Sequence, residues 1–358
     1  MKTKEQQLFK ALCKFKSETC DEGLLEHATP HVLGQLFFNR MQGVAYGTLK
    51  AQNLLGKVNR EFRNSLKGAY EQNVRKNRSF LACVAYIAGL LRGCRCNVAM
   101  LKGALLCGLY PEGYRTSNDI DLLVHPADVT TVGNMLAAAG FRQGNIRNGV
   151  FVPASRREII ESKMTRGETV PYIKEMNMPE MKYLEVDINF SLDYKNSEDT
   201  SLKAMLENMA PQGIYGVCIP TLCTEDFFLH LCGHLYKEAT TLPWVEMHRD
   251  MTLYKYMDLY MLLEEMTEQD IRKLFARVRE LEMEKICGFA ILQTAELFDM
   301  EDAWLLEQAG RALAGETDFL HQVIAPKEKK LYRYDTTDIT ARFFLEERRA
   351  DLKEVKTI

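Results

Sequence analysis

The segment 117–124, with the sequence SNDIDLLV, constrains the fold of this chain more than any other, because it sets two acids in an apolar, β-branched run. Such a run predicts a strand, and successive side chains on a strand alternate between its two faces. The side chains of Asp119 and Asp121 therefore point to the same face of the strand. Two neighbouring carboxylates are costly unless a cation neutralises them. The segment predicts a metal-assisted site for phosphate chemistry at one end of a strand.

Length and composition indicate a folded protein without a membrane span. The 358 residues are enough for two or three domains, and 46% are hydrophobic while 27% are charged. Apolar stretches of about 18 residues, which a spanning helix needs, do not occur in the sequence. The first residues, MKTKEQQ, are polar and differ from a signal peptide, so we expect a cytoplasmic protein. A net charge of -3 argues against bulk DNA binding.

The ten cysteines are scattered through apolar, helical contexts, which favours reduced thiols over disulfides. Cys94 and Cys96 are separated by one residue, which is closer than the usual spacing of zinc ligands. We therefore expect no structural metal there.

The first part of the chain, 1–92, has helical periodicity at 5–16, 30–43 and 45–91. The last of these carries an apolar stripe on one face and many basic residues, between positions 57 and 78, on the other. A solvated face is the favoured interpretation of these basic residues, ahead of a polyanion contact.

The pattern changes after residue 97. A strand at 97–101, a tight turn at 102–103 and a short helix at 104–110 precede the acidic strand, and a helix at 126–140 follows it. Alternating strands and helices of this kind predict an α/β core.

A second strand is predicted at 183–190, where polar and apolar residues alternate. Asp187 lies on its polar face with Glu185 and Asn189, and becomes a third carboxylate for the site. The stretch 150–182 before it predicts a loop-rich insertion with one short helix.

The chain is predicted to be helical again from 221, with surface helix or loop after Pro326. These patterns divide the chain into an N-terminal helical region at 1–92, a core at 93–195 and a C-terminal helical domain at 196–358.

These motifs resemble the polymerase-β-like nucleotidyltransferase superfamily, and most closely its bacterial group of uncharacterised nucleotidyltransferases. The likeness covers about residues 30–265. The matching motifs are LKG at 101–103, RTSNDIDLLV at 115–124, GF at 140–141, VDI at 186–188, and LHLCGH at 229–234 with Lys237. The resemblance implies an α+β fold, in which N-terminal helices and a C-terminal helical domain flank a small mixed-sheet catalytic core.

The resemblance also implies a reaction: transfer of a nucleoside monophosphate from an NTP such as ATP to a hydroxyl, with release of pyrophosphate. Asp119, Asp121 and Asp187 would bind Mg²⁺ or Mn²⁺, which stabilises the charge that develops during the transfer. Asp187 would also help to draw the proton from the attacking hydroxyl. All-oxygen ligands suit Mg²⁺.

Five residues are candidates for binding the nucleotide. Gly103 and Ala104 begin a helix, whose first N–H groups can face phosphate. Arg115 can grip phosphate with two hydrogen bonds, and Ser117 and Lys102 are weaker candidates. Ala104 departs from the superfamily, which usually has Gly or Ser there, so no hydroxyl is offered at this position. A second departure is Asn189, where relatives often have His.

The helical region that follows offers candidates for the acceptor side. His230 and His234 lie one turn apart, with Lys237 near them, and we favour a polar face beside the catalytic cleft over a zinc site. Asp258 lies within an apolar helix. An ion pair with Lys255 or a histidine is favoured there over a role in orienting the acceptor.

The acceptor is not written in the sequence, and a small molecule, an RNA or a protein all fit the chemistry. A toxin-like nucleotidyltransferase acting on tRNA or protein is one alternative, to which the basic residues at 60–78 and 156–166 would contribute. A non-catalytic nucleotide sensor or scaffold is another. A metal-dependent glycosyltransferase is disfavoured, because Asp187 and the Gly103 turn would have no role in it.

Overall fold

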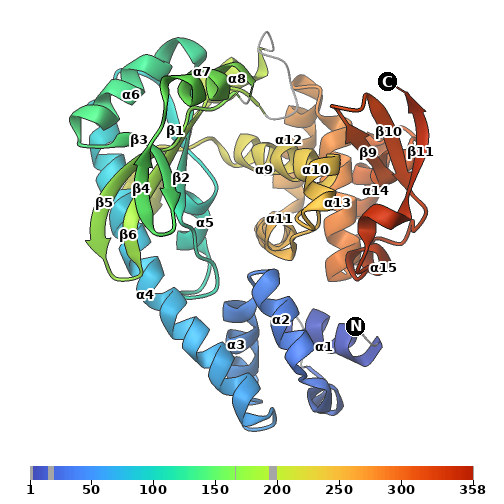
Figure 1. The fold of residues 1–358 in the computed structure, drawn as a ribbon. Helices are drawn as coiled ribbons and strands as arrows, with labels where there is room; N and C mark the ends of the chain where they lie inside the picture. The colour runs from blue at the N-terminus through green and yellow to red at the C-terminus, as the bar shows by residue number, and fades with distance from the viewer. Residues whose placement is uncertain (1–2, 15–19, 166, 193–199, 358) are drawn as a thin grey trace. The chain divides into compact units, whose positions relative to one another are not determined.

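The computed structural model describes residues 3–14, 20–165, 167–192 and 200–357, and the chain forms two compact units (Figure 1). Unit 1 consists of Met1–Leu66 and Phe228–Ile358, and unit 2 of Lys67–Phe227. This division differs from the three consecutive segments predicted from the sequence, because both ends of the chain contribute to one unit.

Unit 2 is built on a six-stranded sheet with the order β1-β2-β6-β5-β3-β4. β2 and β6 are parallel, whereas the other neighbouring pairs are antiparallel. The sheet is therefore mixed, as predicted for an α+β core. The strands are β1 (Val98–Met100), β2 (Asp119–Val124), β3 (Arg142–Arg147), β4 (Val150–Pro153), β5 (Tyr172–Met178) and β6 (Met181–Asn189).

Helices cover one face of this sheet. The long helix α4 (Arg60–Leu91) and α6 (Val129–Ala138) pack there, and the ammonium of Lys174 on β5 donates to Tyr86 Oη of α4 at 2.8 Å. Ile120, Val186 and Ile188 point to this face and are fully buried. The acidic residues of β2 and β6 alternate with them, so they occupy the opposite face.

Smaller elements complete unit 2. They are the helices α5 (Gly103–Leu109), α7 (Arg156–Thr165) and α8 (Ser201–Glu207), and the antiparallel pair β7 (Gln212–Ile214) and β8 (Val217–Ile219).

The short helix predicted within 150–182 is α7, but the rest of this stretch is not loop-rich as predicted, because it contains the strands β4 and β5. The sequence did not predict β5 as a strand, because the charged residue Lys174 occupies a position that faces the helices. Its ammonium is accommodated there by Tyr86 Oη and the Ala139 carbonyl, at 2.8 and 2.7 Å, so the strand lacks a clean apolar face in the sequence.

Unit 1 joins the N-terminal helices to the C-terminal part of the chain. The ring of Phe9 lies 5.8 Å from that of Phe343, and Asn39 Oδ1 accepts a hydrogen bond from Leu253 N at 3.0 Å. The helices of this unit are α1 (Thr3–Cys13), α2 (Pro30–Phe38), α3 (Gln42–Ala51), α9 (Thr224–Ala239, which begins in unit 2), α10 (Leu242–Glu246), α11 (Leu253–Glu265), α12 (Glu268–Glu280), α13 (Glu284–Phe298), α14 (Ala303–Ala312) and α15 (Ile339–Phe343).

Two predictions for unit 1 were wrong, the second only in part. The run at 45–91 is not one helix, since α3 ends at Ala51 and α4 begins at Arg60, and Asn53 between them has a left-handed φ of 58°. The prediction of helix or loop after Pro326 holds for α15 and the turns beside it, but it missed two strands: β10 (Lys330–Tyr334), which pairs with β9 (Gln322–Ala325), and β11 (Leu352–Thr357), which pairs with β10. Lys327 and Lys329 are exposed in the turn before β10, and Lys353 and Lys356 are exposed on β11, whereas Leu331, Tyr332 and Tyr334 of β10 are buried.

All ten cysteines are free thiols, as predicted. In the part of the chain that the structure describes, none of the helices is both long enough and apolar enough to cross a bilayer.

Candidate active site

Four carboxylates gather on the open face of the unit 2 sheet. In the parallel pairing of β2 with β6, Asp121 lies directly opposite Asp187, and Asp119 lies opposite Glu185. Paired residues on neighbouring strands share a face, with backbones about 4.8 Å apart. The structure thus brings together the three aspartates that the sequence predicted, and adds Glu185 to them.

The cluster is electrostatically strained. Burial raises the pKa of Asp187 well above its usual value, and the negative charges of Asp121 and Asp119 raise it further. Burial and the charge of Asp119 likewise raise the pKa of Glu185. The charges of Asp119 and Asp121 thus make Asp187 harder to ionise, and a cation at this face would relieve the repulsion.

Lys102 supplies one positive charge to the cluster. Its Nζ lies 3.0 Å from Asp121 Oδ1, and Asn189 Nδ2 donates to the same oxygen at 3.3 Å. The backbone of Lys102 has φ 45° and ψ −117°, a conformation that non-glycine residues rarely adopt. This turn directs the side chain inward, so Lys102 does not simply turn to solvent at the end of its strand.

Gly103 and Ser117 fit against each other. A Cβ on Gly103 would come within 2.5 Å of both Cβ and Oγ of Ser117, so a larger residue is excluded unless Ser117 moves. Ser117 Oγ donates to Asp119 Oδ1 at 2.9 Å. Gly103 therefore allows Ser117 to approach and hold the first aspartate, a role that the sequence did not reveal.

The other two residues predicted to bind the nucleotide are buried. Ala104 is fully buried, and its N–H bonds to the Leu101 carbonyl at 3.1 Å, while Leu105 N–H bonds to the Lys102 carbonyl at 3.1 Å. The expectation that these first helical N–H groups face phosphate is thus not met by Ala104 or Leu105. Arg115 is largely buried, and its guanidinium donates to the Thr116 carbonyl.

The loop that carries Arg115 is fixed to α4. Asn73 Nδ2 donates to the Gly113 carbonyl at 3.0 Å, and Arg78 forms an ion pair with Glu112 at 2.7 Å. Lys76 contacts Asn118 Oδ1 at the start of the acidic strand. The long helix thereby sets the position of the loop beside the carboxylates.

The donor atoms of the cluster suit Mg²⁺ or Mn²⁺, because Asp119, Asp121 and Asp187 offer oxygen ligands from two adjacent strands. Among the residues that the structure describes, however, no three His, Cys, Asp or Glu side chains converge as a ligand set does. Asp121 is instead engaged by Lys102. The residue types therefore suit a divalent ion, although the side chains of the described residues are not arranged around one in this structure.

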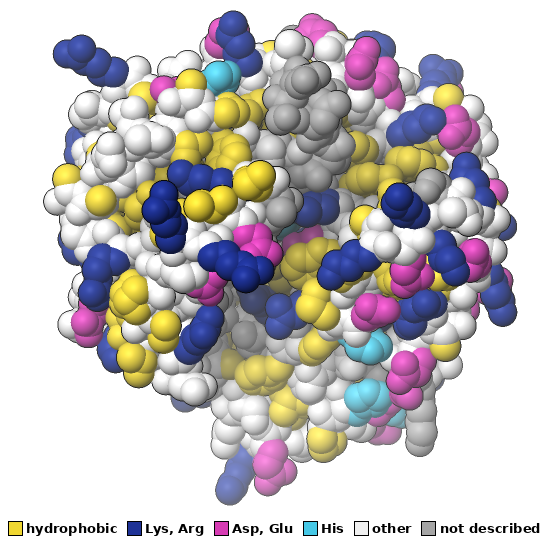
Figure 2. Space-filling model, turned by 45° about the horizontal axis from the view of Figure 1, so that its top comes forward, with side chains coloured by type: hydrophobic (Ala, Val, Ile, Leu, Met, Phe, Trp, Pro, Cys, Tyr) yellow, Lys and Arg dark blue, Asp and Glu magenta, His cyan; other side chains and the backbone are white. Residues whose placement is uncertain are grey.

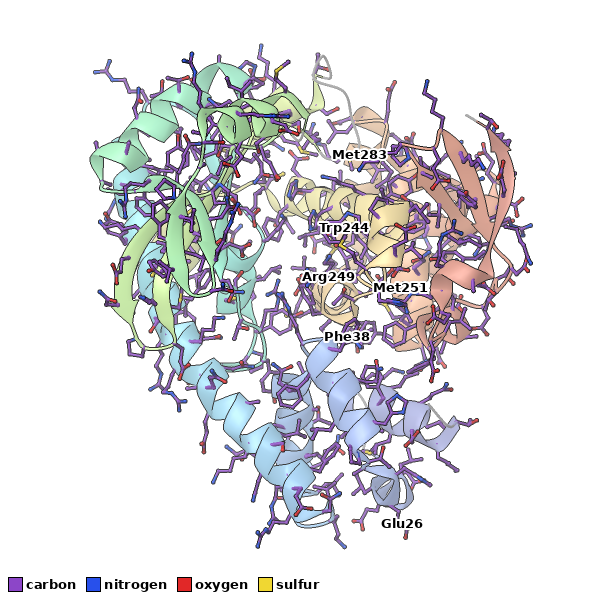
Figure 3. All side chains as sticks on the ribbon, in the orientation of Figure 1. Glu26, Phe38, Trp244, Arg249, Met251 and Met283 are labelled. Atoms are coloured by element: carbon purple, nitrogen blue, oxygen red, sulfur yellow. The ribbon has the colours of Figure 1, made fainter. Side chains whose placement is uncertain are left out.

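The residues predicted for the acceptor side belong to unit 1. His230 and Asp258 are about 95% buried, and His234 Nε2 lies 3.2 Å from Glu238 Oε1. Lys255 contacts Glu238 and lies 5.4 Å from the ring centroid of Trp244, which Figure 3 labels. Lys237 is half-buried on the same helix, α9. His234, Glu238 and Lys255 thus connect α9 to α11 through polar contacts.

Two basic residues of α4 are paired with acids of unit 2. Arg75 pairs with Glu180 at 3.0 Å, and Arg78 pairs with Glu112. A solvated, locally neutralised face describes these two residues better than a polyanion contact. On the face of the molecule in Figure 2, basic and acidic side chains likewise lie side by side.

Sequence reasoning missed the roles of Glu185 and Asn189, which lie beside Asp119 and Asp121. The signal was present, because both share the polar face of β6 with Asp187.

Comparison with known proteins finds a matching family model and similar solved structures. The model of the family described as "Uncharacterised nucleotidyltransferase" matches residues 28–299, which include every candidate residue above. Among solved structures, the chain is similar to the crystal structure of an antigenic nucleotidyltransferase-like protein from Paracoccidioides brasiliensis. The identity is 13% and the TM-score 0.33, over 57% of this chain and 90% of that chain. No curated protein matches the sequence.

Proposed function

The chain belongs to the family of uncharacterised nucleotidyltransferases, and we propose that unit 2 transfers a nucleoside monophosphate from an NTP to a hydroxyl acceptor, with release of pyrophosphate. The observation that carries the proposal is the pairing of Asp121 with Asp187 beside Asp119, on the open face of a mixed sheet. The same arrangement supports membership of the polymerase-β-like superfamily. The free thiols are typical of a reducing compartment and support a cytoplasmic location.

In the proposed reaction, Asp119, Asp121 and Asp187 would hold Mg²⁺ or Mn²⁺. Two bound ions would supply charge stabilisation at the attacking and leaving oxygens. Asp187 would accept the proton of the attacking hydroxyl. The acceptor oxygen then bonds to the α-phosphorus, and the bond from this phosphorus to pyrophosphate breaks.

The nucleotide phosphates are proposed to lie beside Lys102, at the end of β1. Its ammonium is 3.0 Å from Asp121, so phosphate oxygens near that aspartate would meet a positive charge. Arg115 is the second cation of this region, and Ser117 keeps Asp119 oriented. Gly103 and Ala104 are the first residues of α5 and contribute to the shape of the turn that leads into it.

Transfer can be tested with each of the four α-³²P-labelled NTPs, with Mg²⁺ or Mn²⁺, and with a cell extract as the pool of acceptors. Asp119→Asn removes a charged metal ligand and keeps the shape of the side chain, so we expect the label transferred by the wild type to be lost. Asp335→Asn is a matched control, because Asp335 forms an exposed ion pair with Lys353 in unit 1. Full turnover by Asp119→Asn would refute the site.

A nucleotide sensor is the second candidate, favoured by the engagement of Asp121 with Lys102 and by Ala104 in place of a hydroxyl residue. Metal-dependent NTP binding without release of pyrophosphate, in the presence of every acceptor fraction, would assign this function instead.

A further inference from the structure

The open face of the sheet continues beyond the carboxylates to the far strands. Asp119 lies opposite Glu185, Glu185 opposite Ile173, and Ile173 opposite Arg142, so these four residues form one row across β2, β6, β5 and β3. Neighbouring strands are about 4.8 Å apart, so the row spans about 14 Å. One bound molecule can therefore contact both ends of it.

A pocket lies at the far end of this row. Its volume is about 310 Å³, and it is lined by Arg142, Phe151, Pro153, Ile173, Glu175 and Tyr183. Ile173 is 3% exposed and forms an apolar floor. Glu175 and Tyr183 lie opposite each other and share the open face with the carboxylates. The volume is at the small end of the range for ligand sites.

The aromatic side of the pocket is built by close packing. The guanidinium of Arg142 lies 4.4 Å from the ring centroid of Phe151. A Cβ on Gly144 would come within 2.6 Å of the same ring, so glycine is required for the ring to lie against β3. Phe151 and Arg142 thus offer a ring and a guanidinium plane, and Glu175 offers a hydrogen-bond acceptor nearby.

The order of the strands places the pocket on one side of the proposed reaction. Lys102 and the turn into α5 follow β1, at one edge of the sheet, whereas the pocket lies on β5, β3 and β4, beyond Asp187. If the triphosphate lies at Lys102, the pocket is on the acceptor side of the carboxylates.

We propose that this pocket binds an unpaired nucleobase near the 3′ end of a single-stranded RNA, and that the terminal hydroxyl of this RNA is the acceptor. Aromatic rings and guanidinium planes stack on bases whose edges are free, and Arg142 can also pair with a phosphate. Glu175 and Glu185 can accept hydrogen bonds from ribose 2′-hydroxyls, which DNA lacks. This inference rests on the proposed function: the 3′ oxygen bonds to the α-phosphorus, pyrophosphate leaves, and Asp187 takes the proton.

The first test is binding of 5′-fluorescein-labelled single-stranded hexa-adenylate to the full chain, measured by fluorescence anisotropy. Phe151→Ala should weaken binding about tenfold or more, because it removes a stacking surface. Tyr183→Leu should also weaken binding, and is the second variant if Phe151→Ala unfolds on heating below the wild type. Phe38→Ala is the matched control, since Phe38 is an exposed phenylalanine of unit 1 (Figure 3).

Three results would overturn the proposal. The first is an unchanged affinity for hexa-adenylate in both Phe151→Ala and Tyr183→Leu, and the second is equal binding of a DNA hexamer by the wild type. The third is that the pocket variants raise the KM for the NTP and leave the KM for the RNA unchanged. The outcome for catalysis is separate. Asp119→Asn should bind hexa-adenylate as the wild type does. RNA binding that depends on Phe151, without transfer by the wild type, would support the RNA site and refute the proposed reaction. An equal rate of nucleotide transfer to RNA in the wild type and in Phe151→Ala would support the proposed reaction and refute the proposed role of the pocket.

Discussion

At the scale of single residues, Lys102 combines a useful side chain with an unfavourable backbone. Its φ of 45° and ψ of −117° suit glycine, so the contact with Asp121 is made at the expense of backbone strain. Lys102→Gly and Lys102→Ala both remove the contact, but only alanine keeps the strain. We expect the glycine variant to be more stable than the alanine variant by about 1 kcal/mol, measured by urea unfolding. Equal stabilities would show that the turn is not strained.

The three aspartates were predictable from the sequence, because the alternation of a strand fixes which side chains share a face. Asp119, Asp121 and Asp187 obey that rule. The engagement of Lys102 with Asp121 was not predictable, since it depends on a positive φ that nothing in the local sequence requires. The contact between Gly103 and Ser117 was not predictable either, because a helix and a loop separate the two residues in the sequence.

At the scale of elements, α6 lies close to β5 because Gly133 has no side chain. A Cβ there would come within 2.4 Å of Tyr172 Oη and 3.2 Å of its Cζ. Gly133→Ala should therefore destabilise the protein by about 1–3 kcal/mol. Tyr172→Phe removes the nearer atom, so we expect the double variant to recover much of this loss. A double-mutant cycle by chemical denaturation measures the coupling. Strictly additive effects would contradict the close contact.

Elements with a clean apolar pattern were predictable, including β2, β6 and the helix that became α6. β5 and β10 were not, because partners distant in the sequence accommodate their charged residues. Lys174 of β5 needs Tyr86 Oη, and Lys330 of β10 needs Glu354 of β11. The sheet order was likewise not predictable, since β6 pairs with β2 although α6, the β3–β4 hairpin, α7 and β5 lie between them in the sequence.

At the scale of the whole molecule, unit 1 carries an acid-sensitive group. Burial and the nearby charges of Arg342 and Arg333 lower the pKa of His321 to about 4. The unfolded chain binds a proton near pH 6.5, so between pH 6.5 and 4 it gains a proton that the folded chain does not. The free energy of unfolding should fall by about 3 kcal/mol over this range through this group. Above pH 6.5 the group has no effect.

Urea unfolding at pH 7 and pH 4.5 tests this expectation, with His321→Gln as the comparison. The variant should lose less stability on acidification than the wild type does, because its amide does not titrate. The same loss in both proteins would assign the acid sensitivity to carboxylates elsewhere.

The discontinuity of unit 1 has a consequence for synthesis on the ribosome. Residues up to Leu66 are synthesised before unit 2, but some partners of their apolar side chains, such as Phe343 for Phe9, follow unit 2 in the chain. Unit 2 is continuous and is complete before those partners are, and domains generally fold as units during translation. Part of the apolar surface of the N-terminal helices therefore stays exposed until the residues around Phe343 have been synthesised. We expect this interval to be when the protein depends most on chaperones.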